Sequence, residues 1–300
     1  MNTSPAACDG TVRVPGGELR YRLTGTPSSL PTLVFENGWG ASFEQWAWVE
    51  AELASTTRLL LYDRAGIGGS TSAEPQTASA LTTQLLALLA ALRIEKPIVV
   101  GHSYGGLMCA LHAAQAPAAL HAIVQVDNTP ECADPLIDRQ LGAVGAIAHL
   151  SILCARLGIR NPLFAPAAKL LPAAAGSAMM AHSFASASSL RAALHELRII
   201  SSIRASIAKG ERPVPRLVIS AAAPSIERSG VISRLLASPE KARAVQERMH
   251  QLHRLQAAAP GGRCEELPYT HGDLVFTQAG AKATAARIRE LVVGTQSRTG

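Results

Sequence analysis

The sequence predicts an α/β fold, in which a mostly parallel sheet of eight strands is covered by helices on both faces. The main observation is that short apolar, β-rich runs alternate with helical patterns along much of the 300 residues. Composition agrees, since 48% of the residues are hydrophobic and only 17% are charged, which excludes a disordered chain. A chain of this length can bury a full core, with or without an inserted subdomain.

Eight runs have the strand pattern, and five longer patterns indicate helices outside the middle of the chain. The runs are 12–14, 19–23, 32–36, 58–62, 97–100, 122–126, 216–220 and 263–267. The helical patterns are 43–54, 77–92, 104–116, 239–257 and 280–293. Pro15-Gly16-Gly17 links the first two runs so tightly that we expect an antiparallel hairpin at the sheet edge. The near-continuous apolar runs are typical of parallel strands that are buried on both faces.

The alternation stops between residues 129 and 212, where Ala-rich helical patterns are broken by prolines and a glycine. We therefore expect an α/β core of residues 1–128 and 213–300, with a helical cap of residues 129–212 inserted after the sixth strand. The longest apolar stretch, 141–157, is interrupted by polar residues and is shorter than the roughly 20 residues that cross a bilayer. We expect a buried or interfacial helix there and no transmembrane span.

Charge and cysteine content limit the partners and the compartment. The formal net charge is +6, but Lys and Arg are spread along the chain and no basic tract contains interleaved aromatics. We therefore expect no nucleic-acid partner. The five cysteines are an odd number without a CxxC pair, which indicates reduced thiols and a cytoplasmic protein. We expect no secretory signal, because residues 1–5 have neither a basic start nor an apolar run. The expected partner is a small lipophilic substrate, and the sequence leaves open whether the chain forms a homodimer.

The strongest local motif is Gly101-His102-Ser103-Tyr104-Gly105-Gly106, which stands between an apolar run and a helical pattern. In a G-x-S-x-G motif the glycines allow a strand-to-helix turn so tight that the serine hydroxyl is exposed. A serine needs this exposure, together with a base, to act as a nucleophile. Tyr104 opens the following helix, so its backbone N–H can face an oxyanion. We predict that Ser103 is a nucleophile.

Two glycine-rich segments follow earlier strands. Phe35-Glu36-Asn37-Gly38-Trp39-Gly40 comes directly after the third run, and its glycines let the backbone approach a substrate closely, although an ordinary turn has the same composition. Asp63-Arg64-Ala65-Gly66-Ile67-Gly68-Gly69-Ser70 follows the fourth run. We expect a structural role for this second segment, with Asp63 paired to Arg64 and the glycines shaping a loop. No GK[ST] follows them, so a phosphate-binding loop is not indicated.

NGWG, DRAGIGGS and GHSYGG, in this order and at these intervals, resemble the α/β-hydrolase superfamily. The likeness is to its lipases, esterases and ring-fission hydrolases with a lid after the sixth strand. It implies the α/β-hydrolase fold and a Ser–acid–His triad that works without a cofactor or metal. It also implies that Trp39 and Tyr104 supply the oxyanion-hole amides and that Asn37 and Gly38 contact substrate. The family's usual residue ahead of the oxyanion glycine is histidine, and Asn37 changes that polar support.

The same resemblance places the triad histidine between the last strand and the closing helix, where His271 stands. His102 adjoins the nucleophile and by the family pattern packs under the turn. His250 and His253 are three residues apart on one helical pattern, a spacing that suits a metal pair, but no third ligand is evident. We predict His271 as the base and no metal site.

The triad acid departs from the family pattern, in which an Asp follows the seventh strand. Ala221-Ala222-Ala223-Pro224-Ser225 stands there, and the first carboxylate is Glu227. Asp127 instead ends the sixth strand, at the sheet edge where α/β proteins present functional groups. We favour Asp127, with Glu227 second and Glu131 third. An aspartate that caps a helix or braces a loop is the alternative interpretation of Asp127.

These residues predict a serine hydrolase that cleaves a carboxylic ester of a small to medium lipophilic substrate, because the expected cap is apolar. A lactonase or amidase would use the same triad. Two other classes stay open: a cofactor-free dioxygenase or lyase on the same fold, and a binding protein that has lost activity. Only the hydrolase requires Ser103 to react.

Overall fold

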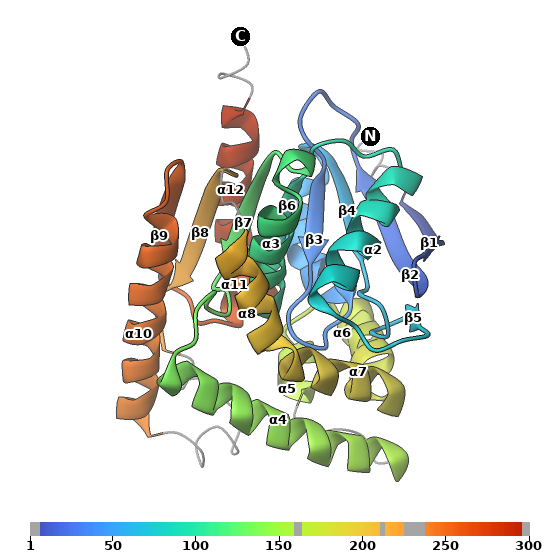
Figure 1. The fold of residues 1–300 in the computed structure, drawn as a ribbon, viewed down its shortest axis with the longest axis vertical. Coiled ribbons are helices and arrows are strands. Elements are labelled where there is room, and N and C mark those ends of the chain that lie inside the picture. The colour runs from blue at the N-terminus through green and yellow to red at the C-terminus, as the bar shows by residue number, and fades with distance from the viewer. Residues whose placement is uncertain (1–6, 159–163, 211–213, 225–237, 296–300) are drawn as a thin grey trace.

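The computed structural model describes residues 7–158, 164–210, 214–224 and 238–295. Its sheet runs in the order β1-β2-β4-β3-β6-β7-β8-β9, and helices lie on both sides of it (Figure 1). The fold class predicted from the sequence is therefore confirmed. The strands on this path are β1 (Cys8–Val14), β2 (Gly17–Gly25), β3 (Leu33–Glu36), β4 (Arg58–Tyr62), β6 (Ile98–His102), β7 (Ala122–Val126), β8 (Arg216–Ala221) and β9 (Gly262–Leu267).

The strand directions follow from the connections. Strands β1 and β2 form the predicted antiparallel hairpin, and Gly16 has φ +79° in the turn, a conformation that glycine adopts without steric cost. Strand β2 is also antiparallel to β4. The pairs from β4 through β3, β6, β7 and β8 to β9 are all parallel. One short strand, β5 (Thr71–Ser72), pairs with β2 and has no counterpart in the prediction.

Alternate residues of the central strands face opposite layers, as the two-residue period of a strand requires. Leu33, Phe35 and Val100 face a cluster formed with α1 (Ala47–Leu53), α11 (Asp273–Phe276) and α12 (Gln278–Gly294). Val34 and Val99 face the other cluster, formed with α2 (Ala78–Ala91) and α3 (Tyr104–Gln115). Because both faces are covered, these strands are mostly apolar.

Between β7 and β8 the described chain is helical, and we call this the α4–α8 segment. Helix α10 (Pro239–Ala257) then packs beside β8. Two short 3₁₀ turns complete the chain, η1 (Phe43–Trp46) before α1 and η2 (Pro117–Ala119) before β7. The α4–α8 segment between β7 and β8 contains α4 (Pro135–Arg156), α5 (Ala165–Ala168), α6 (Ala173–Met179), a π-helical turn η3 (Met180–Phe184), α7 (Ala187–Arg198) and α8 (Ile200–Lys209).

Helix α4 is longer than the apolar stretch from which it was predicted. It has 22 residues because the Asp134 side chain accepts hydrogen bonds from the first-turn amides of Leu136 and Ile137 and so begins the helix earlier. By length and composition alone, α4 is long and apolar enough to cross a membrane. Within the apolar part of the helix, 17% of the residues are buried in the protein. The helix is thus longer than the stretch 141–157, on whose length the expectation of no transmembrane span was based. The helix packs on α7 at one end of the molecule (Figure 1).

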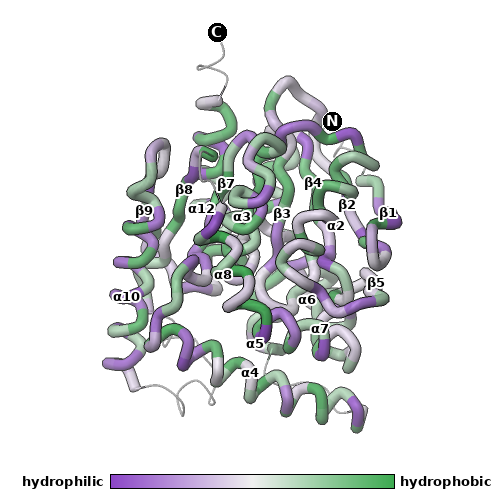
Figure 2. Tube along the Cα trace, in the orientation of Figure 1, coloured by the Kyte–Doolittle hydropathy of each residue, from purple (hydrophilic) through white to green (hydrophobic). Residues whose placement is uncertain are grey.

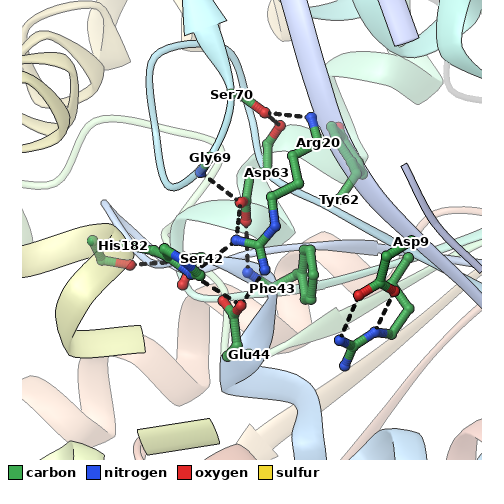
Figure 3. A network of polar contacts seen from close by, with 12 residues as sticks. Asp9, Arg20, Ser42, Phe43, Glu44, Tyr62, Asp63, Gly69, Ser70 and His182 are labelled. Carbon is green, nitrogen blue, oxygen red and sulfur yellow. Dashed lines mark hydrogen bonds and ion pairs between the residues drawn. The ribbon is translucent and has the colours of Figure 1, made fainter. Parts of the chain in front are cut away.

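The predicted Asp63–Arg64 ion pair is absent from the described contacts, because the two side chains diverge. Asp63 accepts hydrogen bonds from Arg20 at 3.0 Å, from the Phe43 amide at 2.8 Å and from the Gly69 amide at 3.0 Å (Figure 3). It is buried, and that burial raises its pKa to about 6 against the opposing charge of Arg20. Asp63 therefore organises its own loop together with the start of η1, as Figure 3 shows, while Arg64 turns the other way.

Candidate active site

Ser103 lies at the turn between β6 and α3, with φ +56° and ψ −119°. A non-glycine residue with positive φ is strained, and such strain concentrates at functional sites. The turn is tight: a Cβ on Gly101 would lie 2.2 Å from the Gly105 carbonyl oxygen, and one on Gly106 would lie 2.3 Å from the Asn128 Cβ. The Ser103 amide donates to the Val126 carbonyl at 3.0 Å, so β7 also holds the turn.

His271 and Asp127 meet across 144 residues of sequence. The Nδ1 of His271 donates to Oδ2 of Asp127 at 2.7 Å, so in the neutral ring Nε2 is the basic nitrogen. Asp127 is buried, and its other oxygen accepts the Ala221 amide at 2.9 Å. Burial alone would raise the pKa of Asp127, but the hydrogen bond and charge of His271 lower it to about 2. Asp127 thus remains ionised at neutral pH.

Two further histidines support this pair without belonging to it. His102 donates from Nε2 to the His271 carbonyl oxygen at 3.0 Å, and their rings lie 4.5 Å apart between centroids. Burial and the neighbouring His271 lower the pKa of His102 to about 3, so it is neutral. His253 is fully buried beside Asp127, where its Nδ1 contacts the Ser220 hydroxyl at 2.9 Å and its Nε2 donates to the Asn128 carbonyl at 2.9 Å.

The other two acid candidates lie elsewhere. Glu131 forms a buried ion pair with Arg216 at 2.6 Å and accepts a hydrogen bond from Gln125, so it is engaged away from His271. Glu227 lies outside the described residues. Among the candidates that the structure describes, Asp127 is the one that contacts His271.

Ser103 and His271 line one cavity of about 310 Å³. The remaining lining is mostly apolar and comes largely from the α4–α8 segment, with Leu141, Val144 and Ile147 of α4 along one side. Phe164 and Phe184 stack at 4.0 Å between ring centroids on another side. A cavity of this size lies at the lower end of ligand pockets, which span about 300–1,000 Å³.

The two predicted oxyanion donors border the same cavity. Tyr104 is the first residue of α3, and the first amides of a helix have no acceptor within the helix. Trp39 belongs to the loop after β3, and its indole Nε1 donates to the Ala193 carbonyl of α7 at 2.6 Å. Gly38 also lines the cavity, and its amide donates to the Gln45 side chain.

Asn37, predicted to contact substrate, is buried and is not among the residues that line the cavity. Its side-chain amide donates to the Tyr62 carbonyl at 2.8 Å and its oxygen accepts from the Trp46 indole at 3.0 Å. Both ends of the side chain are therefore used within the protein. Asn37 fixes the start of the loop.

A buried cluster around Arg64, which sequence reasoning missed, holds this loop in place. Arg64 donates to the carbonyls of Asn37 at 2.6 Å and Gly38 at 3.0 Å. It also donates to Glu196 of α7 at 2.7 Å, and the second oxygen of Glu196 accepts the Gly40 amide at 3.1 Å. The loop is thus tied from both sides, and one of the ties comes from the α4–α8 segment.

Glu36 completes this cluster beneath the loop. It is fully buried and contacts Arg64 at 3.3 Å, His112 at 3.0 Å and the Tyr62 hydroxyl. Burial would raise the pKa of Glu36, but His112, Arg64 and Tyr62 hold it below its ordinary value. A carboxylate at the end of an otherwise apolar strand was the one sequence signal for this cluster, because a buried charge requires a partner.

The described residues contain no group of three or more His, Cys, Asp and Glu side chains that could hold a metal ion. The His250 and His253 pair does not converge on a common site. His250 contacts Glu266, whereas His253 faces the Ser220 hydroxyl.

Comparison with known proteins agrees with this architecture. A family model described as alpha/beta hydrolase fold matches residues 31–143. The 3-oxoadipate enol-lactonase 1 of Acinetobacter baylyi is 37% identical over 92 residues, which is 31% of this chain and 34% of that protein. The pimeloyl-[acyl-carrier protein] methyl ester esterase of Cronobacter sakazakii is 37% identical over 99 residues, 33% of this chain and 36% of that protein. These matches span about a third of each relative.

A solved structure resembles nearly the whole chain. The enol-lactonase from Burkholderia xenovorans LB400 superimposes with a TM-score of 0.62 and 22% identity, covering 96% of this chain and 100% of that one. At this identity the likeness concerns the fold.

Replacing Glu196 tests the attachment of the loop. Glu196→Gln removes the closer of the two carboxylates that pair with the buried Arg64, the other being Glu36, so we expect the free energy of unfolding to fall by about 3 kcal/mol, with faster hydrogen exchange at the Gly40 amide and Trp39 indole. Chemical denaturation and NMR exchange measure the two effects. Glu131→Gln, which breaks the buried pair with Arg216, is the matched control and should lower stability without changing exchange in the loop. Unchanged exchange in Glu196→Gln would contradict the role given to Glu196.

Proposed function

We propose that this chain, whose residues 31–143 match the family model described as alpha/beta hydrolase fold, is a serine hydrolase that cleaves a carboxylic ester of a small to medium lipophilic substrate. The observation that carries the proposal is the strained Ser103 at the rim of a cavity that His271 also lines, with His271 held by an ionised Asp127. Nucleophile, base and orienting acid are the three groups that acyl transfer requires.

In the proposed reaction the Ser103 oxygen attacks the ester carbonyl while His271 Nε2 takes the hydroxyl proton. The amides of Trp39 and Tyr104 stabilise the negative oxygen of the tetrahedral intermediate. His271 then gives the proton to the departing alcohol, which leaves Ser103 acylated. Water, activated by the same nitrogen, attacks the acyl carbonyl and releases the carboxylic acid, so that Ser103 recovers its proton. Asp127 stabilises the charged imidazole in each step.

The apolar lining of the 310 Å³ cavity supports a lipophilic substrate of limited size. The names of the two curated relatives refer to an enol-lactone and to a methyl ester, both acyl–oxygen compounds that the same chemistry opens. A lactone is therefore the second candidate substrate class, ahead of an amide, whose leaving group is poorer.

A covalent label distinguishes the hydrolase from the other classes. We expect a fluorophosphonate probe to modify wild-type protein at Ser103, because the activated oxygen attacks phosphorus as it attacks a carbonyl. Intact-mass and peptide mass spectrometry locate the adduct. Ser103→Ala should accept no label and lose ester hydrolysis, whereas Ser70→Ala, which removes a serine of the Asp63 loop, should label normally. Activity or oxygen consumption that survives Ser103→Ala would indicate a dioxygenase or lyase, and no adduct together with no turnover would indicate a binding protein.

Replacing the acid tests the triad itself. Asp127→Asn should lower kcat about 10⁴-fold, since the imidazole loses the group that orients it and stabilises its charge. Glu227→Gln is the comparison and should leave kcat near the wild-type value, as measured with a soluble p-nitrophenyl ester. The reverse pattern would make Glu227 the acid.

The same variant has a second signature in stability. A carboxylate whose pKa falls from 3.8 in the unfolded chain to about 2 in the folded protein contributes stability that is complete above about pH 4. That contribution, roughly 2 kcal/mol, is lost as pH falls from about 4 to 2. Asp127→Asn should lack this part of the pH dependence in denaturation experiments, whatever its effect on turnover.

Substrate length tests the cavity. For a series of p-nitrophenyl esters we expect kcat/KM to rise with acyl length until the cavity is filled and then to fall. Phe184 also borders a second, apolar cavity of about 690 Å³, so Phe184→Leu should shift the optimum toward longer acyl chains. Phe43→Leu, which trims a ring that is equally buried but lies outside both cavities, is the control and should leave the optimum unchanged. An optimum unchanged in Phe184→Leu would mean that the acyl group lies elsewhere.

A further inference from the structure

Helix α4 presents a row of leucines to solvent on the side that faces away from the protein. Leu150, Leu153 and Leu157, the last just beyond the helix, are 52%, 53% and 65% exposed. Their spacing of three and four residues places them on one side of the helix. In Figure 1 α4 is the outermost element at its end of the molecule, and Figure 2 shows hydrophobic positions along it. These leucines are not part of a core cluster.

The opposite side of the same helix is already occupied. Leu141, Val144 and Ile147 line the cavity that holds Ser103, and Ala148 and Ile152 are buried against α6 and α7. The exposed leucines therefore serve neither the core nor the cavity. A patch of large, exposed apolar side chains marks a surface that binds a protein, a membrane or a ligand.

Basic side chains border this row. Arg156 of α4 lies with Arg191 and Arg198 of α7 around a groove of about 390 Å³, whose other lining includes Leu153 and His149. No acidic side chain lines the groove, and in the described parts of the chain none of the three arginines has an ion pair. The nearest acid on α4 along the adjoining groove, Asp138, is paired with Arg204 at 2.7 Å. The surface thus combines exposed leucines with three guanidinium groups that pair with no carboxylate of the described residues.

We propose that this surface, formed by Leu150, Leu153, Leu157, Arg156, Arg191 and Arg198, docks on an anionic lipid membrane, with α4 lying in the plane of the interface. The leucines would enter the boundary between headgroups and acyl chains, and the guanidinium groups would contact lipid phosphates. Helix α4 is long enough to span a bilayer, but its inner side is used by the protein, so lying on the surface is the arrangement that leaves the fold intact. This inference does not depend on the proposed hydrolysis.

A second copy of this chain is the other occupant that exposed leucines allow. In a two-fold dimer the same patch meets itself, so each set of three arginines would face its own copy. No acid of the patch is available to neutralise them, and like charges brought together across an interface oppose association. The charge of the patch therefore favours anionic lipid.

Vesicle flotation tests the proposal. We expect the wild-type protein to float with vesicles of equimolar phosphatidylcholine and phosphatidylglycerol, to stay behind with phosphatidylcholine alone, and to be released by salt. Each arginine near an anionic surface contributes about fivefold in partitioning, so Arg156→Gln/Arg191→Gln/Arg198→Gln should weaken binding about 100-fold. Arg13→Gln/Lys209→Gln/Lys282→Gln removes the same charge from exposed positions on β1, α8 and α12, and should bind nearly as wild type.

A leucine variant separates adsorption from insertion. Leu150→Ser/Leu153→Ser/Leu157→Ser keeps every charge and should also lose binding, while circular dichroism shows that it is folded. The proposal is overturned if the wild-type protein floats with neither vesicle, if the two charge variants bind alike, or if the leucine variant binds as wild type. It is also overturned if the wild-type protein sediments as a dimer that the leucine variant dissociates and no vesicle is bound.

Discussion

A single buried guanidinium, that of Arg64, joins the parts on which the site depends. Arg64 lies just after the end of β4. Its guanidinium donates to two carbonyls of the loop after β3 and to the Glu196 carboxylate on α7. Burying a guanidinium is costly unless its donors find acceptors, so each of these segments must keep its position for the charge to be tolerated. The loop that carries the Trp39 amide is thereby linked to the α4–α8 segment. Displacing α7 would free Arg64 and Gly40 together, and the shape of the proposed oxyanion hole would change with it.

The position of Asp127 follows from the order of the strands. Strand β7 pairs with β6, which ends at the Ser103 turn, and on its other side with β8. An acid at the end of β7 is therefore within reach of His271, as is one at the end of β8. Here β8 contributes a backbone amide, that of Ala221, to the Asp127 carboxylate. Asp127 also has φ +42°, a conformation that aspartate tolerates better than most residues. In this chain β7 thus supplies the carboxylate that meets the imidazole, and β8 supplies an amide that holds it.

The sequence predicted those features whose causes are local. Strand β4, strand β7 and helix α10 begin and end at the predicted residues, because buried strands are continuous apolar runs and α10 starts at a Ser-Pro cap. The tight turn at Ser103 was predicted from the glycines that flank it. The partners of Arg64 were not found, since Glu196 lies 132 residues away in a helix whose sequence shows no sign of it. The predicted Asp63–Arg64 pair was wrong because each side chain meets a partner that is distant in sequence, Arg20 for Asp63 and Glu196 for Arg64.

Helix α4 shows why composition alone could not assign its role. Its apolar content reflects two separate surfaces: one that lines the cavity through Leu141, Val144 and Ile147, and one that is exposed through Leu150 and Leu153. A helix that is apolar on opposite sides has a weaker amphipathic pattern than a helix that only covers a core. By its hydropathy, such a helix therefore resembles a membrane span. The two surfaces overlap little along the helix, since the cavity residues precede Ala148 and the exposed leucines follow it. The first half of α4 therefore lines the cavity, and the outward side of the second half is free to meet a surface outside the protein.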